Sequence, residues 1–207
     1  MLQLYWAPNT GVIAPEVMCE EMGLAYQRIP VDMDGGEHLE ADYLRLNPAG
    51  QVPAMILDDD TVVTESAAMV LLLGERHPQG SLVPTSESVQ RPAFLRWLLF
   101  LATSVYGAYT GIYHTDRFTN DPDHYPDIRA ASLDRLDRQF SILEAAIAGD
   151  PWFLTGGYSA LDIYLAMLAD WHPEPTRIRD PNPALRRLCD AIEHRTAFRR
   201  VMVRHRS

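Results

Sequence analysis

The stretch from Asn47 to Ser66, NPAGQVPAMILDDDTVVTES, constrains the fold of this chain more than any other. Its first four residues, NPAG, end the helical pattern that precedes them. Two short apolar runs, residues 54–57 and 61–63, are separated by three aspartates and therefore predict a β-hairpin. Residues 64–66 then open an apolar pattern at helical spacing, so we expect a helix to begin where the hairpin ends.

The two ends of this hairpin have the chemistry of a peptide-binding site. The first N–H groups of a helix lack partners within the helix and lie at the positive end of its dipole, and Ser66 adds a hydroxyl donor there. At the other end, Val52-Pro53 precedes the first strand of the hairpin. A cis peptide bond at this proline would turn the N–H and C=O of Val52 outward, toward an extended peptide-like ligand.

The residues before the hairpin complete a recognisable order of elements. Residues 2–6 predict a first strand, residues 26–31 a second strand, and residues 39–46 a short helix. Between the two strands lies a helical pattern that contains Pro15. Because proline is tolerated only in the first turn of a helix, this helix must begin near Gly11 or Val12. The resulting order, βαβαββα, is typical of an α/β domain of the thioredoxin-like type.

Asn9 and Thr10 fall at or just before the start of this first helix. Side chains at such positions commonly satisfy the free N–H groups of the helix end. Here they also place an amide and a hydroxyl beside whatever ligand binds at that end. They are therefore candidate functional residues.

The second half of the chain predicts helices only. We expect a domain at 1–78, a linker at 79–91 rich in proline and serine, and an all-helical domain at 92–207. Residues 94–113 form a long apolar run whose only charge is Arg96, which predicts a central helix that is buried on most of its circumference against the first domain and a second subunit. Residues 128–147 predict an amphipathic helix. Ser159 and Asp162 form a helix capping box, to which we assign a structural role.

Composition excludes several classes of function. The formal net charge of −10 argues against nucleic acid or an anionic membrane as a partner. Cys19 and Cys189 are far apart in helical patterns, so we expect buried free thiols and not a redox pair. The histidine spacing predicts no metal site. No signal peptide or membrane-spanning run is evident, which predicts a cytoplasmic protein, and the arginines near the C-terminus predict a solvated helix face.

Taken together, these motifs resemble the glutathione S-transferase superfamily. The segments QVPA and TESA, with the flanks LRLNPAG and LGERHP, are similar to the glutathione-binding half of that family. The resemblance implies that Gln51, Val52 and Pro53 hold the cysteinyl backbone of glutathione, and that Glu65 and Ser66 hold its γ-glutamyl end. It also implies glutathione as co-substrate, a homodimer and a role in detoxification.

An enzyme of this kind must keep the sulfur of glutathione as a thiolate, because the thiolate is the nucleophile. The family places a Ser, Cys, Thr or Asn in the loop before the first helix. The first domain looks most like bacterial beta-type transferases, but Gly11 and Val12 stand where that type has its Cys and Ser. We therefore predict Thr10 as the activating residue and Asn9 as the second candidate. Tyr106, on the long helix, occupies a place that reaches the sulfur in related enzymes.

Three functions remain in accord with these residues. The first is conjugation of glutathione to a small hydrophobic electrophile. The second is glutathione-dependent disulfide reduction without a protein cysteine, and the third is a glutathione-binding or protein-interaction module that has lost catalysis. For the first function, two places are open for a set of aromatic residues, an acceptor pocket and, more commonly for a stripe at helical spacing, the core. These residues are Trp6, Tyr106, Tyr109, Tyr113, His114 and Trp171.

Overall fold

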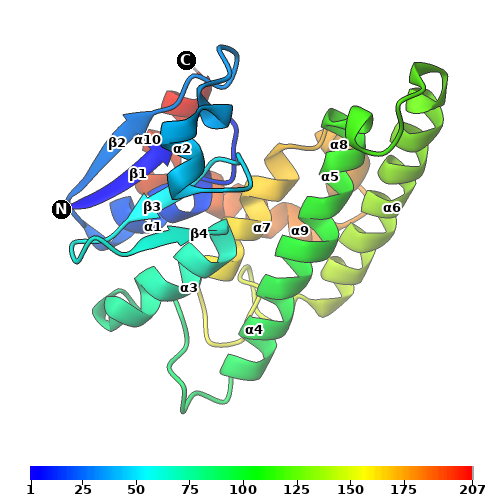
Figure 1. The fold of residues 1–207 in the computed structure, drawn as a ribbon. Coiled ribbons are helices and arrows are strands. Elements are labelled where there is room, and N and C mark those ends of the chain that lie inside the picture. The colour runs from blue at the N-terminus through cyan, green and yellow to red at the C-terminus, as the bar shows by residue number, and fades with distance from the viewer. Residues whose placement is uncertain (207) are drawn as a thin grey trace. The chain divides into compact units, whose positions relative to one another are not determined.

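The computed structural model describes residues 1–206 of the chain. The described residues form two compact units (Figure 1). The first unit comprises Met1–Thr85 together with the C-terminal segment from Glu193 onward, and the second comprises Ser86–Ile192.

A four-stranded mixed sheet forms the centre of the first unit. Its strands are β1 (Leu2–Trp6), β2 (Tyr26–Pro30), β3 (Ala54–Ile56) and β4 (Val62–Thr64), in the spatial order β2-β1-β3-β4. Strands β1 and β2 are parallel, whereas β3 is antiparallel to both β1 and β4. The predicted hairpin and the thioredoxin-like order of the first domain are thus confirmed.

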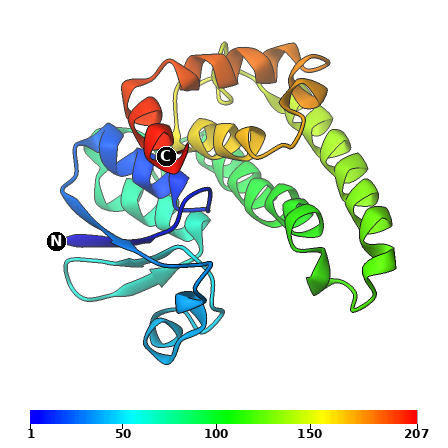
Figure 2. The same ribbon diagram turned by 90° about the horizontal axis from the view of Figure 1, so that it is seen from above.

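Helices cover both faces of this sheet. In Figure 2, α1 (Ile13–Met22) and α3 (Ser66–Arg76) lie on one face, and α2 (Ala41–Leu46) lies on the other. Two short 3-10 helices, Glu37–Leu39 and Pro78–Gly80, flank α2 and α3. As predicted, Pro15 lies in the first turn of α1. Gly23 ends that helix in the left-handed conformation, with φ 64°.

The last helix, α10 (Thr196–Arg206), packs against α1 and belongs to the first unit. The sequence analysis had placed this segment in the helical domain at 92–207. Its arginines explain the difference, because Arg195, Arg200 and Arg204 pair with glutamates of α1. The expected solvated C-terminal face is therefore, in part, an ion-pairing face.

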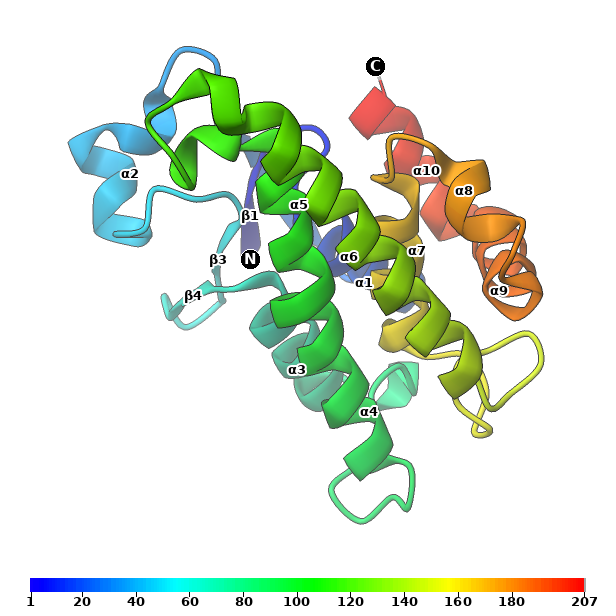
Figure 3. The ribbon, with the colours of Figure 1, turned by 90° about the vertical axis from the view of Figure 1, so that its right-hand side faces the viewer.

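The second unit is entirely helical. One continuous helix runs through α4 (Arg91–Leu99), a π-helical segment (Phe100–Val105) and α5 (Tyr106–Tyr113). Figure 3 shows α5 beside the long helix α6 (Tyr125–Ala146). The remaining elements are two 3-10 helices (Thr115–Arg117 and Pro122–His124), α7 (Ala160–Asp170), α8 (Pro175–Arg179) and α9 (Pro183–Glu193).

The continuous helix of the second unit is buried on one face within the single chain. The buried positions recur at helical spacing, for example Phe94, Leu98, Leu101 and Val105. The opposite face is partly or fully exposed, and Leu99 is 58% exposed. Within one chain this helix is buried on one face, and its expected burial against a second subunit stays a prediction.

The predicted capping box is present at the start of α7. Ser159 and Asp162 bond each other's backbone N–H groups reciprocally, and the Asp162 side chain also accepts a hydrogen bond from the Phe153 N–H at 2.7 Å. Asp162 is fully buried. The box therefore stabilises both the start of α7 and the loop that precedes it.

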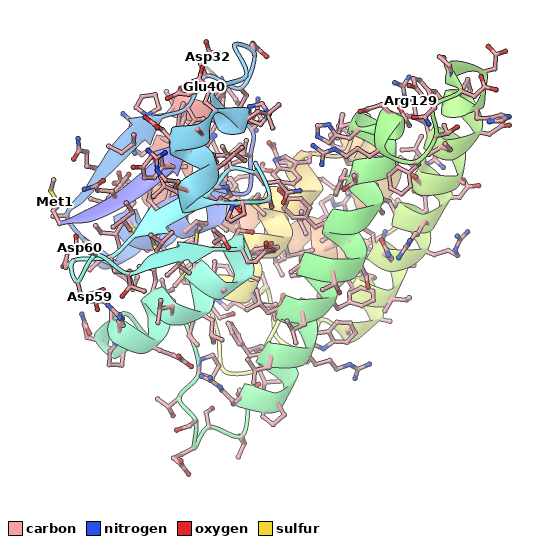
Figure 4. All side chains as sticks on the ribbon, viewed as in Figure 1. Met1, Asp32, Glu40, Asp59, Asp60 and Arg129 are labelled. Atoms are coloured by element: carbon pink, nitrogen blue, oxygen red, sulfur yellow. The ribbon has the colours of Figure 1, made fainter. Side chains whose placement is uncertain are left out.

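Other sequence features have structural explanations. The three aspartates form the tip of the β3–β4 hairpin, where Asp59 and Asp60 point outward in Figure 4. Asp58 pairs with the N-terminal amine at 2.7 Å, and Asp59 pairs with Arg76 at 3.2 Å. Across residues 1–206, no cluster of three or more His, Cys, Asp or Glu side chains is placed to hold a metal ion. Over the same range, no helix has the length and apolar character needed to cross a membrane.

Candidate functional site

Three segments of the first unit meet at one end of its sheet. The strand register places Tyr5 opposite Ala54, and Ala54 opposite Thr64, so these residues form one row across β1, β3 and β4. Three chain segments connect to this row at the same end. The loop before α1 follows β1, Pro53 precedes β3, and Glu65 follows β4. Adjacent strands are about 5 Å apart, so the row spans about 10 Å. An extended tripeptide has about the same length.

The central segment presents an open pair of backbone groups. The Val52-Pro53 peptide bond is cis, as predicted. Neither the N–H nor the C=O of Val52 has a hydrogen-bond partner among residues 1–206. Two hydrogen bonds stabilise the loop before Val52. The carbonyl of Gln51 accepts them from the Tyr43 hydroxyl at 2.8 Å and from Nδ2 of Asn47 at 2.6 Å. These bonds leave Val52 free to pair with an extended chain.

Glu65 and Ser66 stand at the start of α3, as predicted. Glu65 has φ 64° and ψ 108°, a conformation that residues other than glycine rarely adopt and that concentrates at ligand sites. Its side chain is exposed, and its carboxylate has no partner in the part of the chain that the structure describes. Ser66 is the first residue of α3 and is buried. A carboxylate acceptor and a helix N-terminus thus lie side by side.

Asn9 and Thr10 form the bend before α1. Asn9 has φ 53°, which asparagine tolerates better than most residues. Its side chain is exposed and has no partner among residues 1–206. By contrast, the Thr10 hydroxyl donates a hydrogen bond to the Ala7 carbonyl at 2.9 Å. The hydroxyl proton of Thr10 is therefore already engaged, whereas both amide protons of Asn9 are available.

A buried polar network lies directly behind this bend. Its centre is Glu16, which is fully buried in α1. Its carboxylate accepts hydrogen bonds from the Trp6 indole at 2.8 Å and from the Arg204 guanidinium at 2.8 Å. The Tyr26 hydroxyl lies 3.1 Å from this carboxylate and 2.9 Å from that of Glu20, so its proton is shared between the two. His205 is 2% exposed, and its Nε2 lies 3.1 Å from the same carboxylate. Burial tends to raise the pKa of Glu16, but these hydrogen bonds outweigh burial and lower it.

This network was not predicted, although the sequence carries two signals for it. Glu16 is a charged residue within the continuous apolar pattern of α1, and such a residue needs buried partners. His205 continues the stripe of Phe198, Val201 and Met202 on α10, so it occupies a core position. Trp6, for which the sequence left an acceptor pocket open, gives its indole N–H to this network.

The described part of the first unit, residues 1–85 and 193–206, contains one cysteine, Cys19. Cys19 lies in α1 and is fully buried, and burial raises the pKa of its thiol to about 12. A thiol of this kind stays protonated at neutral pH and is inert as a nucleophile.

The second unit holds most of the other predicted aromatic residues. Tyr106 and Tyr109 pack edge-on against Trp171, with ring centroids 5.0 Å and 5.9 Å away, and Tyr109 stacks on Tyr113 at 6.2 Å. Tyr109 is 2% exposed, and its hydroxyl donates to the carbonyl of Leu168. Tyr109 is therefore a core residue, the commoner of the two places that the sequence left open for it.

Comparison with known proteins gives consistent matches along the chain. Residues 15–76 match the model of the glutathione S-transferase N-terminal domain, and residues 115–196 match that of the glutathione S-transferase C-terminal domain. Glutathione S-transferase GstA of Escherichia coli O157:H7 is 27% identical over 176 residues, which cover 82% of each chain. Maleylacetoacetate isomerase of Pseudomonas aeruginosa is 44% identical over 71 residues, which cover 33% of each chain.

Solved structures are similar over nearly the whole length. A glutathione transferase homologue from Sulfitobacter, crystallised with bound glutathione, has a TM-score of 0.90 and 26% sequence identity. The match covers 99% of this chain and 98% of that one.

Proposed function

Because the chain belongs to the glutathione S-transferase family, we propose that it activates the thiol of glutathione as a thiolate for attack on a small hydrophobic electrophile. The observation that carries this proposal is the row across β1, β3 and β4. It gathers a bend with a free amide, an open backbone pair and an exposed acid at one end of the sheet.

Each part of the tripeptide has a complementary group in this arrangement. The N–H and C=O of Val52 pair with the backbone of the cysteinyl residue, beside Gln51 and Pro53. Glu65 receives the ammonium group of the γ-glutamyl end. Ser66 and the N–H groups at the start of α3 receive its carboxylate. The Sulfitobacter homologue, crystallised with glutathione, supports this assignment.

The sulfur then lies toward the bend before α1, where donors stabilise negative charge. The positive end of the α1 dipole favours the thiolate over the thiol. Because Thr10 gives its only hydroxyl proton to Ala7, Asn9 is the better side-chain donor, and Thr10 is second. This order reverses the one predicted from the sequence.

The chemical step follows from the thiolate. The thiol proton leaves to solvent, and the sulfur lone pair forms a C–S bond with the electrophilic carbon. The electron pair of the bond that breaks leaves with the departing group, or is protonated where the acceptor undergoes addition. Tyr106, in the second unit, stays a proposed catalytic residue.

A substrate panel tests the proposal. Purified protein is assayed with glutathione and, separately, with aromatic halides, unsaturated carbonyl compounds and mixed disulfides. We expect turnover of electrophiles together with ultraviolet absorbance of a bound thiolate. Turnover of disulfides alone would favour a glutathione-dependent reductase, and retention on immobilised glutathione without any turnover would favour a non-catalytic binding module.

The proposed setting is that of a cytoplasmic homodimer that acts in detoxification. Buried free thiols at Cys19 and Cys189 suit a reducing compartment. The exposed side chain of Leu99, on the helix through α4 and α5, suits contact with a second copy. Sedimentation velocity measures the oligomeric state directly, and a monomer at micromolar concentration would contradict this part of the proposal.

A further inference from the structure

A histidine on the last helix touches the bend before the first helix. The backbone N–H of Asn9 donates a hydrogen bond to Nδ1 of His205 at 3.0 Å. On the other side of the ring, Nε2 of His205 lies 3.1 Å from Oε2 of Glu16. Nearly the whole chain separates His205 from Asn9 in sequence, yet both belong to the first unit.

These two contacts fix the protonation of the ring. A backbone N–H can only donate, so Nδ1 of His205 must carry a lone pair and no proton. The single ring proton is then on Nε2, and Nε2–H donates to the Glu16 carboxylate. The Trp6 indole nitrogen lies 2.8 Å from the same carboxylate oxygen and 3.2 Å from Nε2 of His205. Because Nε2 carries the ring proton, it cannot accept, and the indole N–H donates to Glu16. His205 is a neutral bridge between Glu16 and Asn9.

Glu16, the partner of Nε2 of His205, is fixed in position by several other side chains. Glu16 is fully buried and is bonded by the side chains of Trp6, Tyr26 and Arg204. Two further ion pairs dock the C-terminal segment on α1: Arg200 with Glu20 at 2.7 Å, and Arg195 with Glu21 at 2.6 Å. The His205 ring therefore has a fixed orientation, and its Nδ1 is a fixed acceptor.

Asn9, the partner of Nδ1 of His205, has a backbone conformation that needs a stabilising contact. Asn9 has φ 53°, and a left-handed conformation outside glycine persists only where its surroundings hold it. The hydrogen bond to His205 binds the backbone N–H of Asn9 and leaves its side-chain amide unengaged. The bond thus holds the bend in the shape that presents this amide.

We propose that His205 is a positioning residue, which acts through Asn9 to hold the bend before α1 in the conformation that activates glutathione. The inference rests on the proposed function of this bend. His205 itself is buried behind the loop and has no role in contact with the substrate.

Two substitutions separate the two hydrogen bonds of the ring. The side-chain oxygen in His205→Asn can take the place of Nδ1 and accept from Asn9, but the bond to Glu16 is lost. The amide nitrogen in His205→Gln can take the place of Nε2 and donate to Glu16, but the acceptor for Asn9 is lost. The matched control is Arg200→Gln, which removes an ion pair between α10 and α1 without touching the bend.

The readouts are the apparent pKa of the glutathione thiol, from thiolate absorbance in the complex, and kcat and KM measured separately. We expect His205→Gln to raise the pKa of the bound thiol by about one pH unit and to lower kcat about tenfold, with KM changed less than about twofold. His205→Asn should stay near wild type in both readouts. Arg200→Gln should lower the melting temperature alone. Equal effects of His205→Gln and His205→Asn would overturn the proposal.

A second measurement needs neither turnover nor a variant. In the ligand-free wild type, nuclear magnetic resonance should detect scalar coupling across the N–H···N hydrogen bond between Asn9 and Nδ1 of His205, and slow exchange of the Asn9 amide. Absence of this coupling, or a proton on Nδ1, would overturn the positioning role even if glutathione binds. Failure of the wild type to bind glutathione, with the coupling present, would overturn the proposed function alone.

Discussion

At the scale of single residues, this protein places two non-glycine residues in left-handed conformations at one end of its sheet. Asn9 has φ 53° and Glu65 has φ 64°, and the side chains of both are exposed without a partner among residues 1–206. For a residue such as Glu65 this conformation costs of order 1 to 3 kcal/mol, and for asparagine it costs less; it is usually retained where a ligand is bound. Both residues therefore lead to direct tests.

Replacing Glu65 by alanine should weaken glutathione binding about tenfold or more. A hydrogen bond to a charged group contributes about 1.5 to 3 kcal/mol, and this one is lost with the carboxylate. Stability should change little, because alanine suffers about the same backbone strain as glutamate. Asp60→Ala is the matched control, since Asp60 also has φ 64° and lies on the same hairpin, but at its far end. Titration calorimetry that gives equal affinities for the two variants would refute the assignment of Glu65.

Asn9→Ala should lower kcat about tenfold and move the pH optimum upward, because the thiolate loses a hydrogen-bond donor. The N–H groups at the start of α1 remain, so the loss should fall short of the hundredfold that removal of one essential donor can cause. Thr10→Val should have a smaller effect, since its hydroxyl proton is engaged with Ala7. A pH–rate profile that changes only in the Thr10 variant would restore the order predicted from the sequence.

At the scale of elements, the start of α7 is the best-defined junction in the second unit. Ser159→Ala should lower the free energy of unfolding by about 1 kcal/mol, the typical value for loss of an N-cap hydroxyl. Burial raises the pKa of Asp162 to about 6, so denaturation by urea is best measured at pH 8, where this carboxylate is ionised. Ser141→Ala is a suitable control, because Ser141 lies inside α6 and its hydroxyl donates to the carbonyl of Asp137, four residues earlier in the same helix.

Activity per folded molecule should be unchanged in Ser159→Ala, since the capping box serves the helix and not the ligand. Reduced activity in a fully folded Ser159→Ala protein would instead tie the box to catalysis.

At the scale of the whole chain, the two ends of the sequence meet in the first unit through Glu16. Hydrogen bonds hold the pKa of Glu16 below its ordinary value of 4.5, despite burial. A carboxyl group with a lowered folded-state pKa contributes stability above the unfolded-state pKa, and this contribution is lost as the pH falls through the folded-state value. The network should therefore stabilise the protein fully at pH 7 and progressively less below about pH 4.5.

Glu16→Gln isolates this contribution. At pH 7 the substitution should cost about 3 kcal/mol, because it breaks a buried, paired charge. The difference in unfolding free energy between wild type and variant should shrink as the pH is lowered from 5 to 3.5, as measured by urea denaturation at each pH. Asp34→Asn, at an exposed acid outside the network, controls for the change in net charge. A difference that stays constant with pH would show that Glu16 does not titrate differently in the folded and unfolded states.

The sequence by itself determined the elements whose signals are local. The hairpin, the start of α3 at Ser66, the limit that Pro15 sets on α1 and the capping box at Ser159 all depend on neighbours within a few residues. Turn chemistry, proline geometry and helix capping act over that range, so the order of elements in the first domain was predictable. The same local signals predicted a site for an extended, peptide-like ligand, and the family resemblance named this ligand as glutathione.

Only the tertiary structure decided what depends on distant contacts. It bound the C-terminal arginines and His205 to α1, and it engaged the Thr10 hydroxyl with Ala7 while leaving the Asn9 amide open. A charged residue in an apolar helix signals that partners must exist, but periodicity cannot say which segment supplies them. Which donor pairs with which acceptor depends on their positions in the folded chain. The helix that packs against α1 is α10, which is nearly two hundred residues away in sequence.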